Sequence, residues 1–170
     1  MQRADLLLTT AQIGMALAGF AGLMTLLSRP APRADARLNE IRFRNMVELS
    51  LMLAAFGLLP FVPAEFGLAE STSWRISSAG YAIACSAFLI HSVRRNRRFM
   101  GRILIVGKVS VALVGVCAGQ ALILGLNALG VFRGLESGVY FGGLFVHFLG
   151  AAFFFIRLLY GAFPEGPPAA

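Results

Sequence analysis

The sequence contains five stretches of twenty or more residues that carry very few charges. They cover residues 6–27, 43–62, 74–93, 103–131 and 138–160. At a rise of 1.5 Å per residue, a helix of about 20 residues crosses the roughly 30 Å hydrocarbon core of a bilayer. We therefore predict an all-α integral membrane protein, a compact bundle of five transmembrane helices that forms a single transmembrane domain over residues 1–170.

The composition supports the same class. The chain is 58% hydrophobic and 14% charged, whereas an average soluble domain is about 25% charged. The five stretches use nearly all of the chain, so we expect neither a soluble catalytic domain nor an enzyme. The first stretch is longer than the apolar region of a secretory signal peptide, and we expect it to be a transmembrane helix of the mature protein.

The distribution of arginine predicts the orientation. The chain carries a formal net charge of +7, and its arginines gather in the short loops 28–42 and 94–102, whereas the other two loops hold only Arg75 and Arg133. Basic loops stay on the cytoplasmic side of a membrane. This places the N-terminus outside and the C-terminus in the cytoplasm. Because loop charge explains the basicity, we expect no nucleic-acid partner. The bias toward alanine and arginine points to a bacterial inner membrane.

Local signals mark where the helices begin and end. Asp35 is a candidate N-cap for the second helix, which would then start before its apolar stretch. Thr72 or Ser73 is the candidate cap of the third helix. Pro60 and Pro63 are expected to kink or close the far end of the second helix, because proline lacks the backbone N–H that a helix uses.

Three ionisable residues fall inside the apolar stretches at a similar distance from the cytoplasmic side. They are Glu48, Arg157 and Lys108, which is the only lysine of the chain. One interpretation is an ion-paired or conducting layer, since a carboxylate in a membrane needs a partner. The other is that Lys108 and Arg157 extend to the headgroups along their aliphatic stems and have no further role.

Polar uncharged residues also occur deep within the stretches. His147 lies near the middle of the last stretch, where an imidazole can hold or pass a proton near neutral pH. It can equally be a neutral side chain hydrogen-bonded to a neighbouring helix. Gln12, Gln120 and Asn127 are further candidates for such interhelical hydrogen bonds.

Small residues recur at intervals of four. The first stretch carries Gly14, Ala18 and Gly22, and the later ones carry Gly115 with Gly119 and Gly138 with Gly142. Small side chains let helix backbones approach closely in lipid. The strips serve either the internal packing of one bundle or contacts between copies of the chain.

The two cysteines, Cys85 and Cys117, fall in the third and fourth stretches. We expect them to act as small packing residues, and they can form a disulfide only if their helices touch at equal depth. With two histidines and two cysteines spread widely along the chain, no metal-ligand spacing is present. We expect no metal and no cofactor.

Two functions remain open. The first is a homo-oligomeric ion channel or small transporter with a basic cytoplasmic mouth, for which one five-helix bundle is too narrow without association. The second is a non-conducting membrane scaffold or an accessory subunit of a larger membrane complex. Both imply that the partners are membrane lipids together with either further copies of the chain or another membrane protein.

Overall fold

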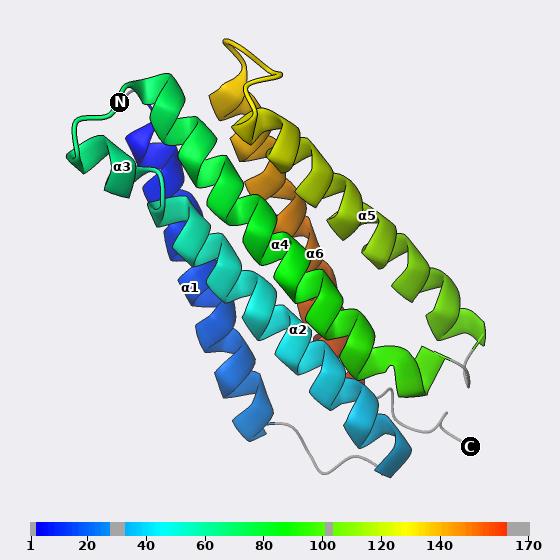
Figure 1. The fold of residues 1–170 in the computed structure, drawn as a ribbon. Coiled ribbons are helices and arrows are strands. Elements are labelled where there is room, and N and C mark those ends of the chain that lie inside the picture. The colour runs from blue at the N-terminus through cyan, green and yellow to red at the C-terminus, as the bar shows by residue number, and fades with distance from the viewer. Residues whose placement is uncertain (1–2, 28–32, 101–103, 163–170) are drawn as a thin grey trace. The chain divides into compact units, whose positions relative to one another are not determined.

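The structure is a computed structural model of the chain. It describes the backbone of residues 3–27, 33–100 and 104–162, and the side chains of residues 3–24, 40–94 and 114–160. Within these ranges all regular structure is helical, so the all-α prediction is confirmed for the part of the chain that is described. The helices are α1 (Ala4–Leu27), α2 (Arg33–Leu58), α3 (Phe61–Glu65), α4 (Glu70–Met100), α5 (Leu104–Ala128) and α6 (Glu136–Ala162), as drawn in Figure 1.

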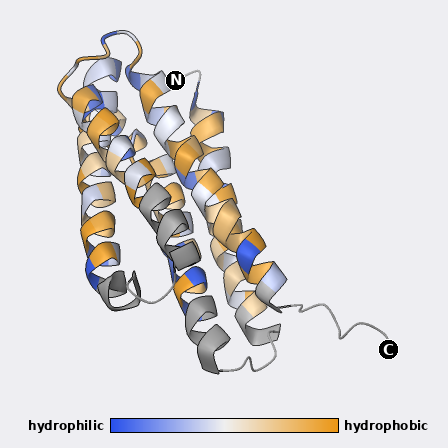
Figure 2. Ribbon diagram, turned by 90° about the vertical axis from the view of Figure 1, so that its right-hand side faces the viewer, coloured by the Kyte–Doolittle hydropathy of each residue, from blue (hydrophilic) through white to orange (hydrophobic). Residues whose placement is uncertain are grey.

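Four of these helical regions are long and apolar enough to cross a membrane. They are Ala4–Met24, Glu40–Glu65, Glu70–Arg94 and Glu136–Tyr160. In α5 the apolar part with described side chains, Val114–Ala128, is shorter than such a span. Figure 2 shows hydrophobic residues distributed along the length of these helices.

Two helices begin earlier than their capping signals predict. Helix α2 begins at Arg33, so Asp35 lies in its first turn and not at the cap. Helix α4 begins at Glu70, and the prediction that Thr72 or Ser73 caps it is wrong. The Ser73 hydroxyl instead donates to the carbonyl of Ala69 at 3.2 Å. An acidic residue in the first turn favours a helix start through the dipole, which accounts for both early starts.

The prolines act at the junction between α2 and α4. Helix α2 ends at Leu58, and Pro60 then starts the short helix α3, which also contains Pro63. Gly67 follows with a φ of 72°, a left-handed conformation that glycine adopts without steric cost. The expected closing of the second span by its prolines is therefore seen as a helix end followed by one extra turn of helix.

The chain divides into two compact units. The first comprises residues 1–58 and 144–170, and the second comprises residues 59–143, so α6 begins in the second unit and continues in the first. In the first unit α1 and α2 run side by side (Figure 1). Gly14 approaches the backbone of Ser50 and Ala54, and Gly57 approaches that of Leu7 and Ala11. These pairs show that the two helices are antiparallel and that glycine allows a close backbone approach at two neighbouring levels, in the first half of α1 and the second half of α2.

The core of the first unit lies between α1, α2 and the later part of α6. Ala21, Met46 and Leu158 are buried at its centre. Around them pack Leu17, Met24, Phe43, Val47, Phe154 and Phe155. The rings of Phe20 and Phe155 have their centroids 6.5 Å apart. The later part of α6 is therefore held to α1 and α2 by apolar and aromatic contacts.

The contact at Gly14 gives a test of the α1–α2 packing. A Cβ at position 14 would lie 2.6 Å from the Ser50 carbonyl oxygen and 2.7 Å from the Ala54 nitrogen, whereas none of the described residues lies within 4 Å of a Cβ at Gly22. We expect Gly14→Ala to lower the free energy of unfolding by about 1–3 kcal/mol, the usual range for overpacking.

The matched control is Gly22→Ala in the same helix, which should be neutral or slightly stabilising because alanine is the better helix former. Thermal unfolding of the purified variants in detergent micelles measures both. Equal melting temperatures for the two variants would contradict the close approach at Gly14.

Candidate functional site

A row of polar side chains joins α4, α5 and the start of α6 within the second unit. We call it the polar seam and define it by Arg75, Ser78, Tyr81, Gln120 and Asn127. Ser78, Tyr81, Gln120 and Asn127 are buried, whereas Arg75 is exposed. Positions 78 and 81 share one face of α4, and positions 120 and 127 share one face of α5. The seam is therefore produced by two helical faces that meet.

Gln120 lies at the centre of the seam. Its side-chain nitrogen donates to the Tyr81 hydroxyl at 3.1 Å and to the carbonyl of Gly143 at 3.0 Å. The Tyr81 hydroxyl donates to the same Gly143 carbonyl at 3.1 Å. Gly143 permits this because its missing side chain leaves room for Tyr81, Leu124 and Gln120. One carbonyl of α6 is thus held by donors from both α4 and α5.

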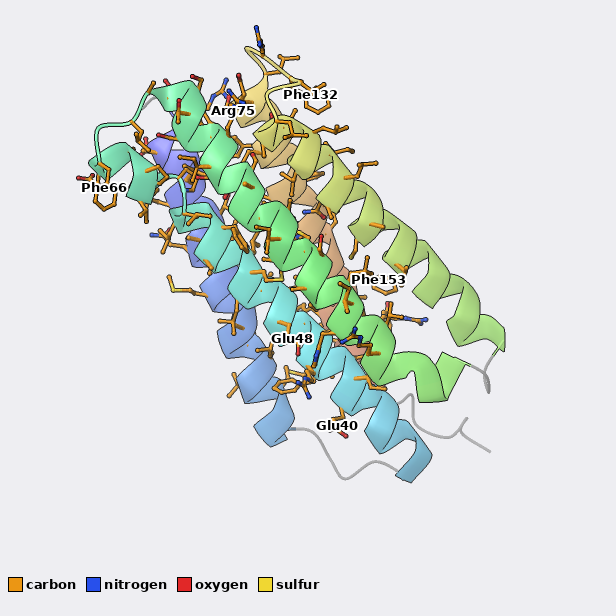
Figure 3. The ribbon with its side chains drawn as sticks, in the orientation of Figure 1. Glu40, Glu48, Phe66, Arg75, Phe132 and Phe153 are labelled. Carbon is orange, nitrogen blue, oxygen red and sulfur yellow. The ribbon has the colours of Figure 1, made fainter. Side chains whose placement is uncertain are left out.

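Asn127 and Arg75 hold the end of α5. The Asn127 amide nitrogen donates to the Ser78 hydroxyl at 2.8 Å and to the carbonyl of Glu136 at 2.9 Å. The Nε of Arg75 donates to the carbonyl of Ala128 at 3.1 Å, and its guanidinium lies against Gly130. Figure 3 shows Arg75 near the N-terminal end of α4, close to the loop that carries Phe132. The bond from Arg75 satisfies a carbonyl at the C-terminal end of α5 that the helix itself leaves open. The bonds from Asn127 join α5 to α4 and to the start of α6.

Aromatic rings surround this end of the seam. The ring of Tyr140 lies 5.5 Å from that of Trp74 and 5.6 Å from that of Tyr81, measured between centroids. The Trp74 indole nitrogen donates to a carboxylate oxygen of Glu70 at 3.3 Å. The Tyr81 hydroxyl therefore makes its hydrogen bonds beside packed aromatic rings, which favour a fixed geometry.

The three ionisable residues predicted to form a layer have the following surroundings. Glu48 accepts a hydrogen bond from the Nε of Arg44 at 2.8 Å, an ion pair one turn apart on α2, and Figure 3 shows Glu48 on that helix. The guanidinium carbon of Arg157 lies 5.8 Å from the ring centroid of Phe153, one turn earlier on α6. Lys108 falls within α5, but its side chain lies outside the described residues.

His147 and the small residues of the predicted packing strips differ in how closely they are packed. His147 is buried in the part of α6 that belongs to the first unit. Ala18 is half-buried in α1, one turn after the closely packed Gly14. The remaining predicted packing glycines, Gly22, Gly115, Gly119, Gly138 and Gly142, have none of the described residues within 4 Å of a Cβ position.

Three members of the seam were not predicted: Arg75, Ser78 and Tyr81. A signal for Tyr81 exists, because it lies seven residues inside the span from Trp74, far from the interface where tyrosine is usually found. Ser78 and Arg75 give no comparable signal. Serine is common in membrane helices, and Arg75 falls at a predicted helix end where arginine needs no partner.

The seam is built for holding helices together. Its groups are amide, hydroxyl and guanidinium donors that bond to carbonyls and hydroxyls of neighbouring helices. Among the described residues there is no group of three or more His, Cys, Asp or Glu side chains that could hold a metal ion. No family model matches the sequence, and no curated protein or solved structure matches it either.

Gln120 and Gln12 provide a matched test of the seam. Gln120 makes two interhelical hydrogen bonds, whereas Gln12 is an exposed residue of α1. We expect Gln120→Leu to lower the free energy of unfolding by about 1–2 kcal/mol, because hydrogen bonds between membrane helices each contribute roughly 0.6–1.7 kcal/mol. Gln12→Leu should change it little or raise it.

Reversible unfolding of both variants in mixed micelles, followed by circular dichroism, measures the difference. If Gln120→Leu is as stable as the wild type, then the hydrogen bonds of the seam do not stabilise the second unit.

Proposed function

We propose that the chain is an integral membrane protein with five transmembrane helices. The observation that supports this most directly is where the large apolar side chains lie. Many are exposed on the described helices, while the amides of Gln120 and Asn127 are buried. A water-soluble protein rarely leaves so much apolar surface uncovered. The exposed residues include Leu6, Ile13, Met15, Phe20 and Leu23 of α1, Ile76, Ile83 and Ile90 of α4, Val116 and Leu122 of α5, and Phe145, Leu149 and Ile156 of α6.

Helix α5 supplies the fifth span in this proposal. It has 25 residues, which at 1.5 Å per residue is about 37 Å of helix and sufficient for a bilayer. Its sequence carries one charge, Lys108. With five spans and the arginine-rich loops 28–42 and 94–102 in the cytoplasm, the N-terminus lies outside and the C-terminus inside, in a bacterial inner membrane.

Single cysteines on a background with Cys85 and Cys117 replaced by alanine test this topology. We expect Leu68→Cys and Arg133→Cys to react with a membrane-impermeant maleimide in intact cells, because both positions are exposed and lie in loops assigned to the outside. Arg94→Cys, in a cytoplasmic loop, should react only after permeabilisation.

Labelling of the expressed variants is read by a mobility shift on a gel. Reaction of Arg94→Cys in intact cells, or protection of Leu68→Cys and Arg133→Cys there, would contradict the orientation. Reaction at only one of the two outer positions would contradict the number of spans.

We further propose that copies of the chain associate into a homo-oligomeric ion channel or small transporter with a basic cytoplasmic mouth. The supporting observation is the open face at the glycine motifs. Gly115 and Gly119 on α5, and Gly138 and Gly142 on α6, have no described neighbour that a Cβ would meet. Glycine strips of this kind let helices of different subunits approach closely.

The charges determine which ions such an assembly would favour. Arginines are concentrated in both cytoplasmic loops. Lys108 lies within about two turns of loop 94–102, and Arg157 lies about one turn from the cytoplasmic end of the last span. Rings of basic side chains select anions. Glu48 is paired with Arg44, so its charge is offset within α2. The proposal is therefore an anion-preferring path with Lys108 at its lining.

Ion flux from liposomes that contain the purified protein tests conduction. We expect flux above that of empty liposomes and a preference for anions in the wild type. Lys108→Met should weaken that preference roughly fivefold, because one charge in an aqueous path changes an ion's free energy by about 1 kcal/mol. The control is Arg133→Gln, on the opposite side, which should leave selectivity unchanged.

The alternative is a non-conducting scaffold or accessory subunit. The polar seam favours this alternative. Its donors bond to groups within the chain, so helix packing alone accounts for them. Folded wild type that gives no flux in either ion gradient would support this alternative and contradict conduction.

A further inference from the structure

The two cysteines occupy the next position along the polar seam. On α4, Cys85 follows Tyr81 by four residues, and on α5, Cys117 precedes Gln120 by three residues. Residues three or four apart lie on the same face of a helix. Because Tyr81 and Gln120 bond to each other across the α4–α5 contact, both cysteines lie on the faces that meet there.

Their depths also agree. Arg75 and Ala128 are bonded at one end of the contact. Cys85 lies ten residues from Arg75 along α4, and Cys117 lies eleven residues back from Ala128 along the antiparallel α5. These lengths differ by one residue, which is about 1.5 Å of helix. Counted from the Tyr81–Gln120 bond, Cys85 lies four residues along α4 and Cys117 lies three residues back along α5, so the two depths again agree to within one residue.

Contact between the two helices supports this placement, since α4 and α5 pack against each other. Both cysteines are free thiols, Cys85 buried and Cys117 half-buried. The condition for a disulfide, that the two helices touch at equal depth, is therefore met.

We propose that Cys85 and Cys117 form a dithiol site that closes to an intramolecular disulfide and fastens α4 to α5. In the reaction the two thiols lose two protons and two electrons, and one S–S bond forms. The oxidant takes up the two protons and the two electrons. A quinone dissolved in the lipid becomes a quinol, and diamide, the oxidant used in the test, becomes a hydrazine. Half-buried Cys117 reacts with the oxidant first, and Cys85 then displaces the reduced oxidant from its sulfur.

The partial exposure of Cys117 determines which oxidants can reach the site. Its neighbours Val116 and Ala118 on α5 are exposed, and the proposed membrane places this surface against lipid. Diamide, which is small and uncharged, therefore reaches Cys117, whereas a charged oxidant that stays in water does not. This step rests on membrane insertion, but the pairing of the two thiols does not.

Oxidation of the full-length protein in membranes tests the site. Diamide is added, remaining thiols are alkylated, and intact mass spectrometry counts the alkyl groups. We expect the wild type to lose both alkylation sites while it still runs as a monomer on a non-reducing gel. Dithiothreitol should restore both sites, and digestion should give one linked peptide pair that contains positions 85 and 117.

The control variant moves one thiol by a single residue, Cys117→Ala with Ala118→Cys. This turns the thiol about 100° around α5, to an exposed position. Disulfide formation should then be at least about tenfold slower, because the Cβ of residue 118 points away from the face that meets α4. Cys85→Ser and Cys117→Ser should each keep one alkylation site. Melting temperatures of the reduced variants establish that they are folded.

Two results would overturn the proposal. The first concerns wild type treated with diamide at a concentration that oxidises the exposed cysteine of the shifted variant. The proposal is overturned if this wild type retains both alkylation sites or forms only disulfide-linked dimers. The other is equal rates of internal disulfide formation in the wild type and in the shifted variant. Loss of ion flux or of membrane insertion would affect neither reading, because the linkage is measured directly.

Discussion

The hydrogen bonds of Gln120 and Asn127 are the constraint on which the second unit depends. Burying an amide on an apolar helix costs free energy unless the amide finds a hydrogen-bond partner. Gln120 finds the Tyr81 hydroxyl and the Gly143 carbonyl, and Asn127 finds Ser78 and the Glu136 carbonyl. All of these bonds can form together in only one register of the helices. Apolar side chains alone would permit α4 and α5 to slide.

Once that register is fixed, the positions of several other groups follow. Arg75 reaches the carbonyl at the end of α5, and Tyr140 packs between Trp74 and Tyr81. The two cysteines reach the same level on facing sides of α4 and α5. The proposed disulfide site is thus a consequence of bonds made by other residues, which is why neither cysteine needs a special local sequence to be placed there.

The sequence predicted the helical class and the approximate extent of each long helix, because uninterrupted apolar stretches leave few other structures available. It predicted the helix starts less well. Thr72 and Ser73 have the side chains of N-caps, but the helix already starts at Glu70. Gln120 was a clear candidate for interhelical bonding. Its partner Tyr81 was not, because which side chains face each other depends on a register that no single helix encodes.

The glycines also show that a sequence motif does not identify the helix that packs against it. The regular motifs of α5 and α6 predict close packing, yet the described structure leaves Gly115, Gly119, Gly138 and Gly142 open. Gly57 belongs to none of the strips noted in the sequence, and with Gly14 it makes the tightest backbone approach between α1 and α2. A small residue permits an approach, but a helix must lie opposite to use it. Among the described residues no helix lies opposite the motifs of α5 and α6, so the pattern alone does not identify what packs there.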